Sequence, residues 1–559
     1  MCARIRFPII IFIFIGVSAV CADAAVYQWS HSYGDAEDQV ATSVALDNVG
    51  NVILVGHFDG TVDFGGGALV CDGPSSCMFL SKLDRFGNHV WSRNLGDSLK
   101  YGTNKLAIDG DSNVFLVNDF HGTADFGGGL IAAQGLRDGI IAKFDAAGEH
   151  VWSRGFGGSS ASVDVKAAGV DGSGNLIVAG LFTGTIDFGG ATLSASWFVT
   201  NMFVVKFHPT GAHLWSRKYT GGGSIVITAV AADPAGNTIL SGYHSGSFDF
   251  GGGTLTADLY NAFVAKYDTN GDHGWSHSFG DPGTYQYIHD VAADLSGNVF
   301  VTGDFRDPLD LGGGSLTNAG GPDIFLAKFD PDGNHIWSKR FGDAEPQRSY
   351  SVAVDGPGHV LLAGHFFGAV DFGGGALVAD PIDFCVARFD GEGTHYWSER
   401  FDVFSLGLQN DKEYSIAAAA NVSGDMAFVG TFKDAVDCGG GDLAYNGGWD
   451  VFVTNYVPVV SGIRATDTVN LCLDAYPNPF NPRTTITYSV PEPGVVRVGL
   501  YGVDGRHVRT LIDRWAPVGH HNTTWDGRDT RGRTVASGVY FVRLETAGRT
   551  QTKRVVLLK

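Results

Sequence analysis

The dipeptide Trp-Ser recurs along this chain at nearly equal intervals. Its seven tryptophans are separated by 62, 61, 63, 60, 62 and 60 residues, and they are Trp29, Trp91, Trp152, Trp215, Trp275, Trp337 and Trp397. Self-similarity over tens of residues is typical of units that cannot bury their apolar faces alone and therefore stack on copies of themselves. The period predicts a repeat protein. It also implies that most residues which recur with it are repeated for structural reasons.

Each repeat contains four short runs of the kind that form β-strands. In the sixth copy these are SVAVD (351–355), HVLLAGHF (359–366), DFCVARFD (383–390) and HYWSERF (395–401). The runs are rich in β-branched and aromatic residues and are bounded by Gly, Asp, Asn or Pro, which is the strand signature. Gly beside Asp or Asn between runs one and two, and between runs three and four, predicts tight hairpins. Four antiparallel strands in a meander predict one propeller blade.

The phase of the repeat predicts how the ring closes. The chain enters with a lone fourth-type strand, VYQWSHSYG (26–34), and the last repeat stops after its third strand, DVFVTNYV (450–457). The first strand then completes the last repeat, which gives seven blades and leaves no open sheet edge to invite aggregation. The units resemble the seven-bladed β-propeller repeat family found in bacterial surface proteins. That resemblance implies an all-β fold and a secreted protein, and it implies no particular activity.

The chain divides into four predicted segments. Arg4 and Arg6 precede an apolar run at 7–15 and small residues up to Ala25, so residues 1–25 are predicted to be a secretory signal peptide. That run is too short to span a membrane and no later segment qualifies, so we expect no transmembrane helix in the mature chain. Residues 26–457 form the predicted propeller, 458–471 a linker without the repeat signature, and 472–559 a second domain.

The charge changes sign between the two domains. Residues 472–559 carry a net charge of +6 and residues 1–471 a net charge of −27, which together give the −21 of the whole chain. An acidic ring repels phosphates, so a nucleic-acid partner is not expected. The simplest interpretation of the negative charge is solubility, and weak attraction for cations or polybasic partners is the alternative.

Five cysteines follow the predicted signal peptide, which is an odd number for a secreted chain. Cys71 and Cys77 flank one loop and are placed to close a local disulfide. Cys385 and Cys438 occupy positions held by Phe or Leu in other repeats and are interpreted as small buried hydrophobic residues. Cys472 remains, and no Cys-x-x-Cys pair supports a structural zinc site.

The last 88 residues carry the most specific motifs of the chain. Alternating apolar runs at 485–490, 495–501, 522–525, 538–545 and 553–558, separated by Gly and Asp turns, predict a small Ig-like β-sandwich. The domain resembles the C-terminal sorting domain of type IX secretion cargo and the related Ig-like domain of the flagellar hook-capping protein. The residues that carry this resemblance as a sorting motif are Tyr476, Pro477, Asn478, Pro479, Asp504, Gly505, Arg506, Gly538, Tyr540 and Lys559.

By this resemblance the tail is an address. It implies export of the folded protein across the outer membrane of a Gram-negative bacterium, with the outer-membrane secretion machinery as partner, to the cell surface or the medium. The alternative is that the sandwich is only a stalk or an accessory domain.

A histidine precedes the tryptophan by two residues in six of the seven repeats. Histidine is a common metal ligand and acid–base group. These six lie on six different blades and cannot converge on one ion, so we expect each to partner its Trp or to make a hydrogen bond between blades. They are His89, His150, His213, His273, His335 and His395.

Two other recurring patterns resemble ligand loops. Asp-Phe-Gly-Gly-Gly begins at Asp63, Asp125, Asp249 and Asp371, but no helix follows, so a turn capped by its own Asp is expected rather than a phosphate loop. Turns such as DPDGN (330–334) and DTNGD (268–272) lack the distal bidentate Glu of calcium loops. We predict no cofactor, metal or catalytic residue and keep calcium as an alternative.

A functional site is expected where the repeat is broken, because a site on the axis needs different groups from different blades. The irregular segments are 402–414, which includes Asp411 and Glu413, the segment from Arg306, and the segment around Trp197. The sequence favours a secreted or cell-surface, non-enzymatic binding or structural module, with a surface polysaccharide or protein as ligand. The alternative is an extracellular polysaccharide-acting hydrolase or lyase with its site at the propeller mouth.

Overall fold

The computed structural model is all-β. It describes residues 25–73, 75–97, 104–196, 201–281, 283–403, 416–433, 435–458, 473–476, 480, 483–490, 494–516, 519–546 and 549–558. These residues contain strands and no helix, and hence no helix that could cross a membrane. The chain separates into two compact units, Met1–Val459 and Val460–Lys559, and each is described by itself.

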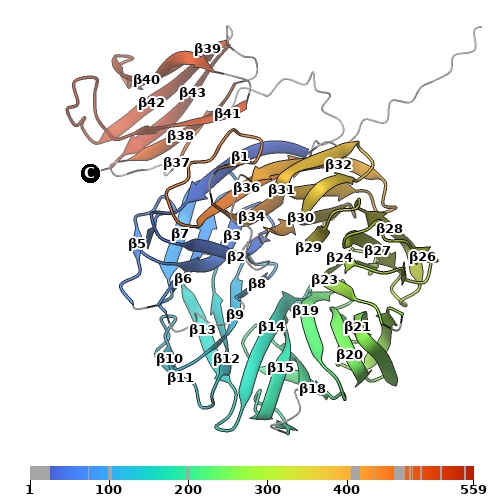
Figure 1. The fold of residues 1–559 in the computed structure, drawn as a ribbon. Coiled ribbons are helices and arrows are strands. Elements are labelled where there is room, and N and C mark those ends of the chain that lie inside the picture. The colour runs from blue at the N-terminus through green and yellow to red at the C-terminus, as the bar shows by residue number, and fades with distance from the viewer. Residues whose placement is uncertain are drawn as a thin grey trace, which may run out of the picture. The chain divides into compact units, whose positions relative to one another are not determined.

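The first unit is a ring of antiparallel sheets, one for each repeat (Figure 1). The first three sheets are β2 (Gln39–Leu46), β3 (Val52–Phe58), β6 (Cys77–Leu83) and β7 (His89–Asn94); β8 (Lys105–Ile108), β9 (Val114–Phe120), β12 (Asp138–Phe144) and β13 (His150–Phe156); and β14 (Ser162–Val170), β15 (Leu176–Ile186), β17 (Asn201–Phe207) and β18 (His213–Tyr219). The next two are β19 (Ile225–Ala232), β20 (Thr238–Asp249), β21 (Thr254–Tyr267) and β22 (His273–Phe279); and β23 (Gln286–Ala293), β24 (Val299–Phe305), β27 (Asp323–Phe329) and β28 (His335–Phe341).

The last two sheets complete the ring. They are β29 (Gln347–Val354), β30 (Val360–Asp371), β31 (Ala376–Phe389) and β32 (His395–Val403); and β33 (Ile416–Ala420), β34 (Met426–Phe432), β36 (Asp450–Pro458) and β1 (Ala25–Tyr33). Short strands extend the loop between the second and third strands of a blade. They are β4 (Thr61–Val62), β5 (Leu69–Val70), β10 (Thr123–Ala124), β11 (Ile131–Ala132), β16 (Leu193–Ala195), β25 (Leu309–Asp310), β26 (Ser315–Leu316) and β35 (Val436–Asp437).

The predicted closure is present. Strand β1 pairs antiparallel with β36, from Ala25 opposite Pro458 to Tyr33 opposite Val451. The first strands of successive blades contact one another around the axis, from β2 through β8, β14, β19, β23 and β29 to β33 and back to β2. The predicted all-β propeller is therefore confirmed, with the N-terminal strand as the outermost strand of the last sheet.

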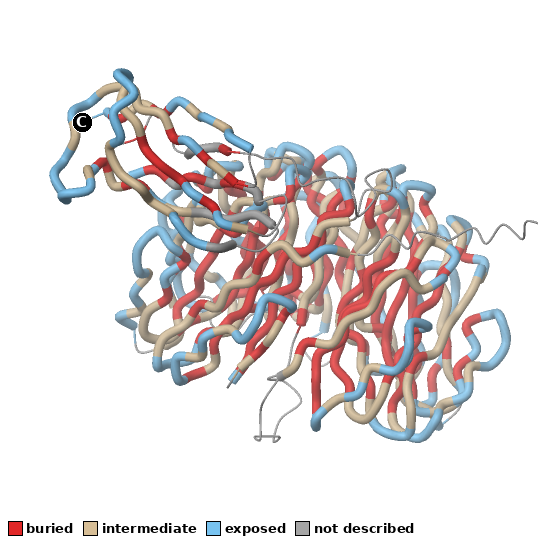
Figure 2. Tube along the Cα trace, turned by 90° about the horizontal axis from the view of Figure 1, so that it is seen from above, coloured by how far each residue is buried: buried red, intermediate tan, exposed pale blue. Residues whose placement is uncertain are grey.

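Burial follows the position of a strand within its blade. The second and third strands are buried over almost their whole length, whereas the first and fourth strands alternate with partly exposed residues (Figure 2). Central strands covered on both faces lose their polar alternation, and their apolar side chains fill the space between neighbouring blades. Exposed positions gather in the loops on the two faces of the propeller.

The first strands share an irregularity that matters for the axis. In five of them the pairing with the second strand shifts by one residue at the same position. The residues at this β-bulge are Thr42, Lys166, Thr228, His289 and Tyr350. A bulge adds one unpaired residue and re-aims its side chain. The residue at the bulge therefore does not follow the in-and-out alternation of side chains that its neighbours follow.

The second unit consists of two sheets. One is β37 (Leu473–Tyr476), β38 (Thr484–Val490) and β41 (Gly519–Trp525), and the other is β40 (His507–Ala516), β39 (Gly494–Gly502), β42 (Gly538–Thr546) and β43 (Arg549–Leu557). Buried apolar side chains from both sheets form one core around Trp525. The predicted sandwich is confirmed, although the apolar-run prediction omitted β37 and β40 as strands.

The cysteines behave as predicted where they are described. Cys71 and Cys77 form a disulfide with their Cα atoms 5.6 Å apart. Cys385 and Cys438 are free and fully buried, and burial raises the pKa of both thiols. A buried thiol with a raised pKa is a poor nucleophile, so both act as packing residues. Cys472 lies outside the described residues.

Candidate functional site

The repeated tryptophans hold neighbouring blades together. In six of them the indole Nε1 donates a hydrogen bond of 2.9–3.2 Å to a backbone carbonyl in the turn between the third and fourth strands of the next blade. The seventh, Trp397, packs on Tyr456 with ring centroids 5.2 Å apart. The Trp-Ser repeat is thus an inter-blade contact, and the tryptophans are not a row of binding aromatics.

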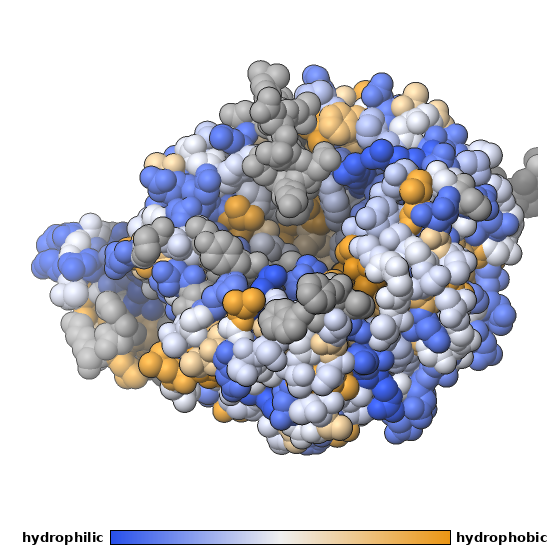
Figure 3. Space-filling model, turned by 60° about the horizontal axis from the view of Figure 1, so that its bottom comes forward, coloured by the Kyte–Doolittle hydropathy of each residue, from blue (hydrophilic) through white to orange (hydrophobic). Residues whose placement is uncertain are grey.

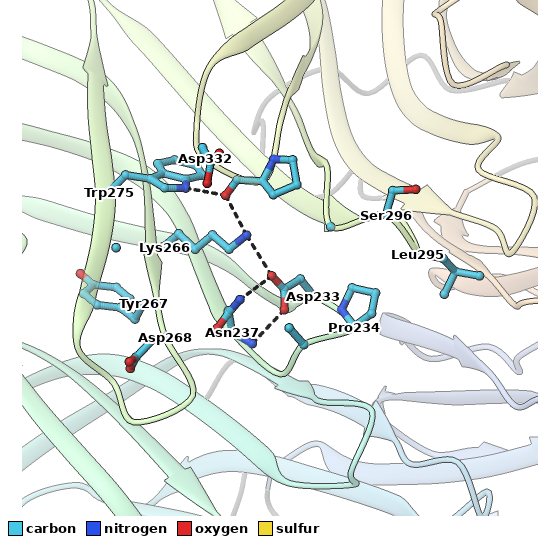
Figure 4. A pocket seen from close by; sticks show the side chains of 14 residues that line it. Asp233, Pro234, Asn237, Lys266, Tyr267, Asp268, Trp275, Leu295, Ser296 and Asp332 are labelled. Carbon is cyan, nitrogen blue, oxygen red and sulfur yellow. Dashed lines mark hydrogen bonds and ion pairs between the residues drawn. The ribbon is translucent and has the colours of Figure 1, made fainter.

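A buried cation on the third strand accompanies this contact. Lys266 pairs with Asp233 at 2.9 Å and donates to the Pro331 carbonyl at 3.0 Å, beside the bond from Trp275 to the same carbonyl (Figure 4). Equivalent pairs are Lys82–Asp47, Lys143–Asp109, Lys206–Asp171 and Arg388–Asp355 at 2.6–3.0 Å. The cavity of about 510 Å³ in Figure 4 is lined largely by these recurring groups. They satisfy one another, so this cavity is a structural joint.

The histidine pattern and the glycine loops explain each other. The side chain of His273 lies against the loop 249–253, where a Cβ on Gly252 would overlap its ring, and the other five histidines face their own loops in the same way. In five blades the His Nε2 bonds the Ser three residues later at 2.9–3.1 Å. Our expectation of a Trp partner or a bond between blades was wrong, because the neighbouring Trp makes the inter-blade bond.

The Asp of each glycine loop caps its own turn. Asp249 Oδ1 accepts from the backbone N–H of Gly251 at 2.7 Å and of Gly253 at 3.1 Å, as predicted. In the oxygen-rich turn at 330–334, the Asp330 carboxylate accepts two backbone N–H groups and the Asn334 amide at 2.8–2.9 Å. Among the described residues no cluster of three or more His, Cys, Asp or Glu side chains is placed to hold a metal ion.

The described residues of the predicted sorting motif lie in hairpins and at strand ends. Asp504, Gly505 and Arg506 form the turn between β39 and β40, where the Gly505 φ of 76° and an Arg506 N–H bond of 3.1 Å to Asp504 Oδ1 fix a tight loop. Tyr540 donates to the Ala536 carbonyl at 2.7 Å and packs on Trp525. Tyr476 ends β37 and Gly538 begins β42. Pro477, Asn478, Pro479 and Lys559 lie outside the described residues.

Aromatic side chains from three consecutive blades gather at the end of the propeller axis where the first strands begin, which we call the channel mouth. Tyr285, Tyr287 and His289 follow one another along and just before β23, with ring centroids 6.5 and 6.2 Å apart and planes within 25°. Together with four further rings they form the aromatic arc, which consists of Tyr243, Tyr260, Tyr285, Tyr287, His289, Tyr350 and His365. Six of these side chains are partly or fully exposed, and Tyr285 is 36% exposed.

Two hydrogen-bonded pairs lie within or beside the aromatic arc. His289 Nε2 contacts Asp304 Oδ1 at 2.5 Å, and the Tyr350 hydroxyl contacts His365 Nδ1 at 2.9 Å. The rings of His289 and Tyr350 are 6.1 Å apart. The mouth therefore brings two imidazole rings together with a carboxylate and a phenol hydroxyl.

Blades two and three contribute charged side chains instead. Arg137 pairs with Asp119 through its Nε and with Asp164 at 3.4 Å through its Nη2, and Lys166 pairs with Asp164 at 2.8 Å. These four residues form the charged arc. Burial raises the pKa of Asp119 despite its guanidinium partner. The mouth is therefore asymmetric, with aromatic rings supplied by one group of blades and ion pairs by another.

A cavity of about 310 Å³ lies on the axis and is lined by residues of all seven first strands. One face of the ring is hollowed at its centre, where hydrophilic and hydrophobic residues both border the hollow (Figure 3). His289 and Tyr350 of the aromatic arc line the cavity together with Lys105 and Asp290. Burial lowers the pKa of Lys105 and raises the pKa of Asp290 to about 6.

Sequence reasoning looked for this site in the irregular loops and overlooked the first strands. Asp411, Glu413 and Trp197 lie outside the described residues. Arg306 is described and lies near Tyr287, whose pKa is raised by burial, an effect that the Arg306 charge partly offsets. The sequence carried a signal, because the bulge position changes chemical type from blade to blade, whereas the residues on either side of it are apolar or small in four of the five bulged strands.

Comparisons with known proteins bear mainly on the tail. Residues 474–558 match the protein family described as Secretion system C-terminal sorting domain. The chain is 27% identical over 263 residues to an uncharacterized WD repeat-containing protein of Acanthamoeba polyphaga mimivirus, across 38% of this chain. The chain spans only 19% of the length of that curated relative.

Similar solved structures share little sequence with this chain. PorZ, a surface component of the type-IX secretion system of Porphyromonas gingivalis, is 13% identical with a TM-score of 0.22, over 93% of this chain and 81% of its own. The polysaccharide lyase PL25-Ulvanlyase is 11% identical with a TM-score of 0.38, over 76% of this chain and 97% of its own. Similarities this low do not assign a function.

The matched tail and the fold around it lead to one conclusion about location. A domain of the type IX sorting kind occupies almost the whole second unit, with its own buried core. The chain is thus a repeat propeller that carries a type IX C-terminal sorting domain, and it is a secreted or cell-surface protein.

Proposed function

We propose that this surface propeller binds an extracellular saccharide at the channel mouth without turning it over. The observation that supports the proposal is the aromatic arc. Its rings lie at positions where the residue type differs from blade to blade, and most of them are partly or fully exposed. A contiguous exposed aromatic surface is unusual on a soluble domain and marks an interaction site.

Tyrosine and histidine rings suit a saccharide ligand. Their faces are apolar and stack against the C–H faces of sugar rings, while the hydroxyl and ring nitrogen supply hydrogen bonds at the edge. The nearly parallel rings of Tyr285, Tyr287 and His289 extend over two successive spacings of more than 6 Å. That strip provides room for more than one sugar unit.

The two hydrogen-bonded pairs favour a second candidate, an extracellular hydrolase or lyase. His289 with Asp304, and Tyr350 with His365, are arrangements that can hold a proton donor and a proton acceptor at one surface. Both candidates use the same mouth, and they differ in whether a bound saccharide is cleaved.

The test screens the full secreted chain against a panel of polysaccharides for retention in affinity electrophoresis and for released products. We expect retention without product release. The variant Tyr287→Ala should weaken retention about tenfold, or about 1.4 kcal/mol, because it removes one aromatic contact surface. The matched control Tyr396→Ala removes a tyrosine from a fourth strand and should change nothing. Product release would replace the binding proposal with the enzymatic one.

We also propose that the tail delivers the chain to the secretion machinery through the turns named above. Deleting residues 472–559 should leave the propeller on the inner side of the outer membrane, because the chain then lacks its sorting domain. The propeller should still fold, since each unit is compact by itself. Cell fractionation with antibody against the propeller measures this. Normal appearance of the truncated chain at the surface would show that the sandwich is an accessory domain.

A further inference from the structure

We infer that the ligand of the channel mouth carries an acidic group and that Lys105 pairs with it. The inference rests on the proposed function, because it names the chemical class of the saccharide bound at the same site. The acidic oxygens belong to a carboxylate or a sulfate on a sugar ring. Both present several acceptors to one ammonium group.

Lys105 is the one cation at its level of the channel among the described residues. It begins β8 and lines the axial cavity of about 310 Å³. The equivalent residues of the other first strands are short or acidic, and they are Ser43, Ala167, Ala229, Asp290, Ser351 and Ala417. The Lys105 side chain, which lines the cavity from blade two, therefore departs from the repeat. It is also separate from the Trp, Lys and Asp set that joins neighbouring blades.

Most other buried or half-buried cations of the propeller have a carboxylate partner. Five third-strand cations pair with a carboxylate at 2.6–3.0 Å, and Arg137 and Lys166 pair with Asp119 and Asp164. The Lys105 backbone pairs with Val117 of β9, but its ammonium group makes no hydrogen bond and no ion pair within the described part of the chain. Its ammonium offers three donors and no acceptor. Burial already lowers its pKa, so the charged form gains from any acceptor that enters the cavity.

Asp290 lines the same cavity, but its oxygens are already used. It accepts from Ser351 Oγ at 3.1 Å and from the backbone N–H groups of Val352 at 2.8 Å and Val291 at 2.9 Å. The bonds from Ser351 and Val352 join blade five to blade six. Burial lowers the pKa of Lys105, and the negative charge of Asp290 partly offsets that effect.

The cavity has the size and surroundings for one acidic sugar unit. About 310 Å³ is at the lower end of small-molecule sites. His289 belongs both to the cavity wall and to the strip with Tyr285 and Tyr287. A sugar ring stacked at the end of the strip thus brings its acidic substituent to the level of Lys105.

The negative charge of the propeller favours a short acidic oligosaccharide as the test ligand. Residues 1–471 carry −27, which repels a long polyanion, although the repulsion is screened beyond about 8 Å at physiological salt. A short acidic oligosaccharide meets the ammonium locally and avoids most of this repulsion.

The test is isothermal titration calorimetry of the full secreted chain with trigalacturonate, its carboxyl-reduced counterpart and a sulfated galactose trisaccharide. We expect at least one acidic trisaccharide to bind about tenfold or more tighter than the reduced one, as a charge-assisted hydrogen bond implies. Lys105→Gln should abolish this difference, Lys105→Arg should keep most of it, and the exposed Lys218→Gln should have no effect. Thermal unfolding verifies that each variant is folded.

The two proposals fail in distinguishable ways. Equal binding of acidic and reduced trisaccharides, or acidic binding that Lys105→Gln leaves intact, would overturn the role of Lys105. Binding of neither acidic trisaccharide would overturn it as well. Retention of other polysaccharides that is lost in Tyr287→Ala would still support the saccharide site. The arm that binds, carboxylated or sulfated, identifies the acidic group.

Discussion

The two ends of the propeller use polar and aromatic side chains in different ways. At the end with the Asp-Gly turns, Trp275, Lys266 and Asp233 bond only to protein groups, and the same set recurs from blade to blade. At the channel mouth, Tyr287 and Lys105 occupy positions where each blade differs, and they retain exposed rings or unused donors. Repetition therefore indicates structure in this molecule, and departure from repetition indicates a site.

The largest expected effect tests the structural end. Trp215 is 8% exposed and joins two blades through a 2.9 Å bond to the Thr269 carbonyl. Trp215→Ala should lower the free energy of unfolding by about 3–5 kcal/mol, since it removes a large packed ring and leaves a cavity. Chemical denaturation measures the loss. Tyr287→Ala, at a partly exposed ring, should cost much less stability, and a cost equal to that of Trp215→Ala would break the comparison.

A smaller effect sharpens the account of the glycine loops. Gly252→Ala places a methyl group into the ring of His273 and should destabilise the protein by about 1–3 kcal/mol through overpacking. Gly172→Ala, at a turn with nothing within 4 Å of the new atom, should change stability by less than about 0.5 kcal/mol. A double-mutant cycle with His273→Ala should recover most of the loss. Independent, additive effects of the two substitutions would contradict the proposed contact.

The smallest expected effect is on the pH dependence of the free energy of unfolding, and it comes from Asp290 in the axial cavity. Burial raises the pKa of Asp290 to about 6 in the folded state, above its ordinary value of 3.8. The group therefore contributes stability that is fully present below about pH 4 and is lost as the pH rises through 6. In Asp290→Asn the unfolding free energy should fall less between pH 4 and 7 than in the parent chain. The exposed Asp72→Asn is the control and should keep the parent slope.

Much of the fold followed from local patterns. The period, the Asp-Gly turns and the phase at the two ends predicted the propeller and its closing strand, because hairpin chemistry and strand order are written in neighbouring residues. The caps at Asp249 and the disulfide at Cys71 and Cys77 followed for the same reason. The tail was predicted from motifs that its family shares.

The mouth was not predicted, because it depends on a register that the sequence does not display. A shift of one residue in a strand moves side chains to the other face. The bulge makes this shift inside five first strands, at His289 and Tyr350 in two of them. Residues from distant repeats therefore meet at positions that simple alternation assigns elsewhere. The partner of His273 was misassigned for a related reason, since the loop that it faces folds back along its own blade.

The pairing of β1 with β36 determines the order in which this protein can fold. Trp29 and Thr454, joined by a bond from the Thr454 hydroxyl to the Trp29 carbonyl, are 425 residues apart in sequence. Closing so long a loop costs only about 0.6 kcal/mol for each doubling of its length, but contacts this distant slow folding. Strand β1 is the first strand of the ring in sequence and its partner β36 is the last, so the ring can close only after all of its repeats have been synthesised.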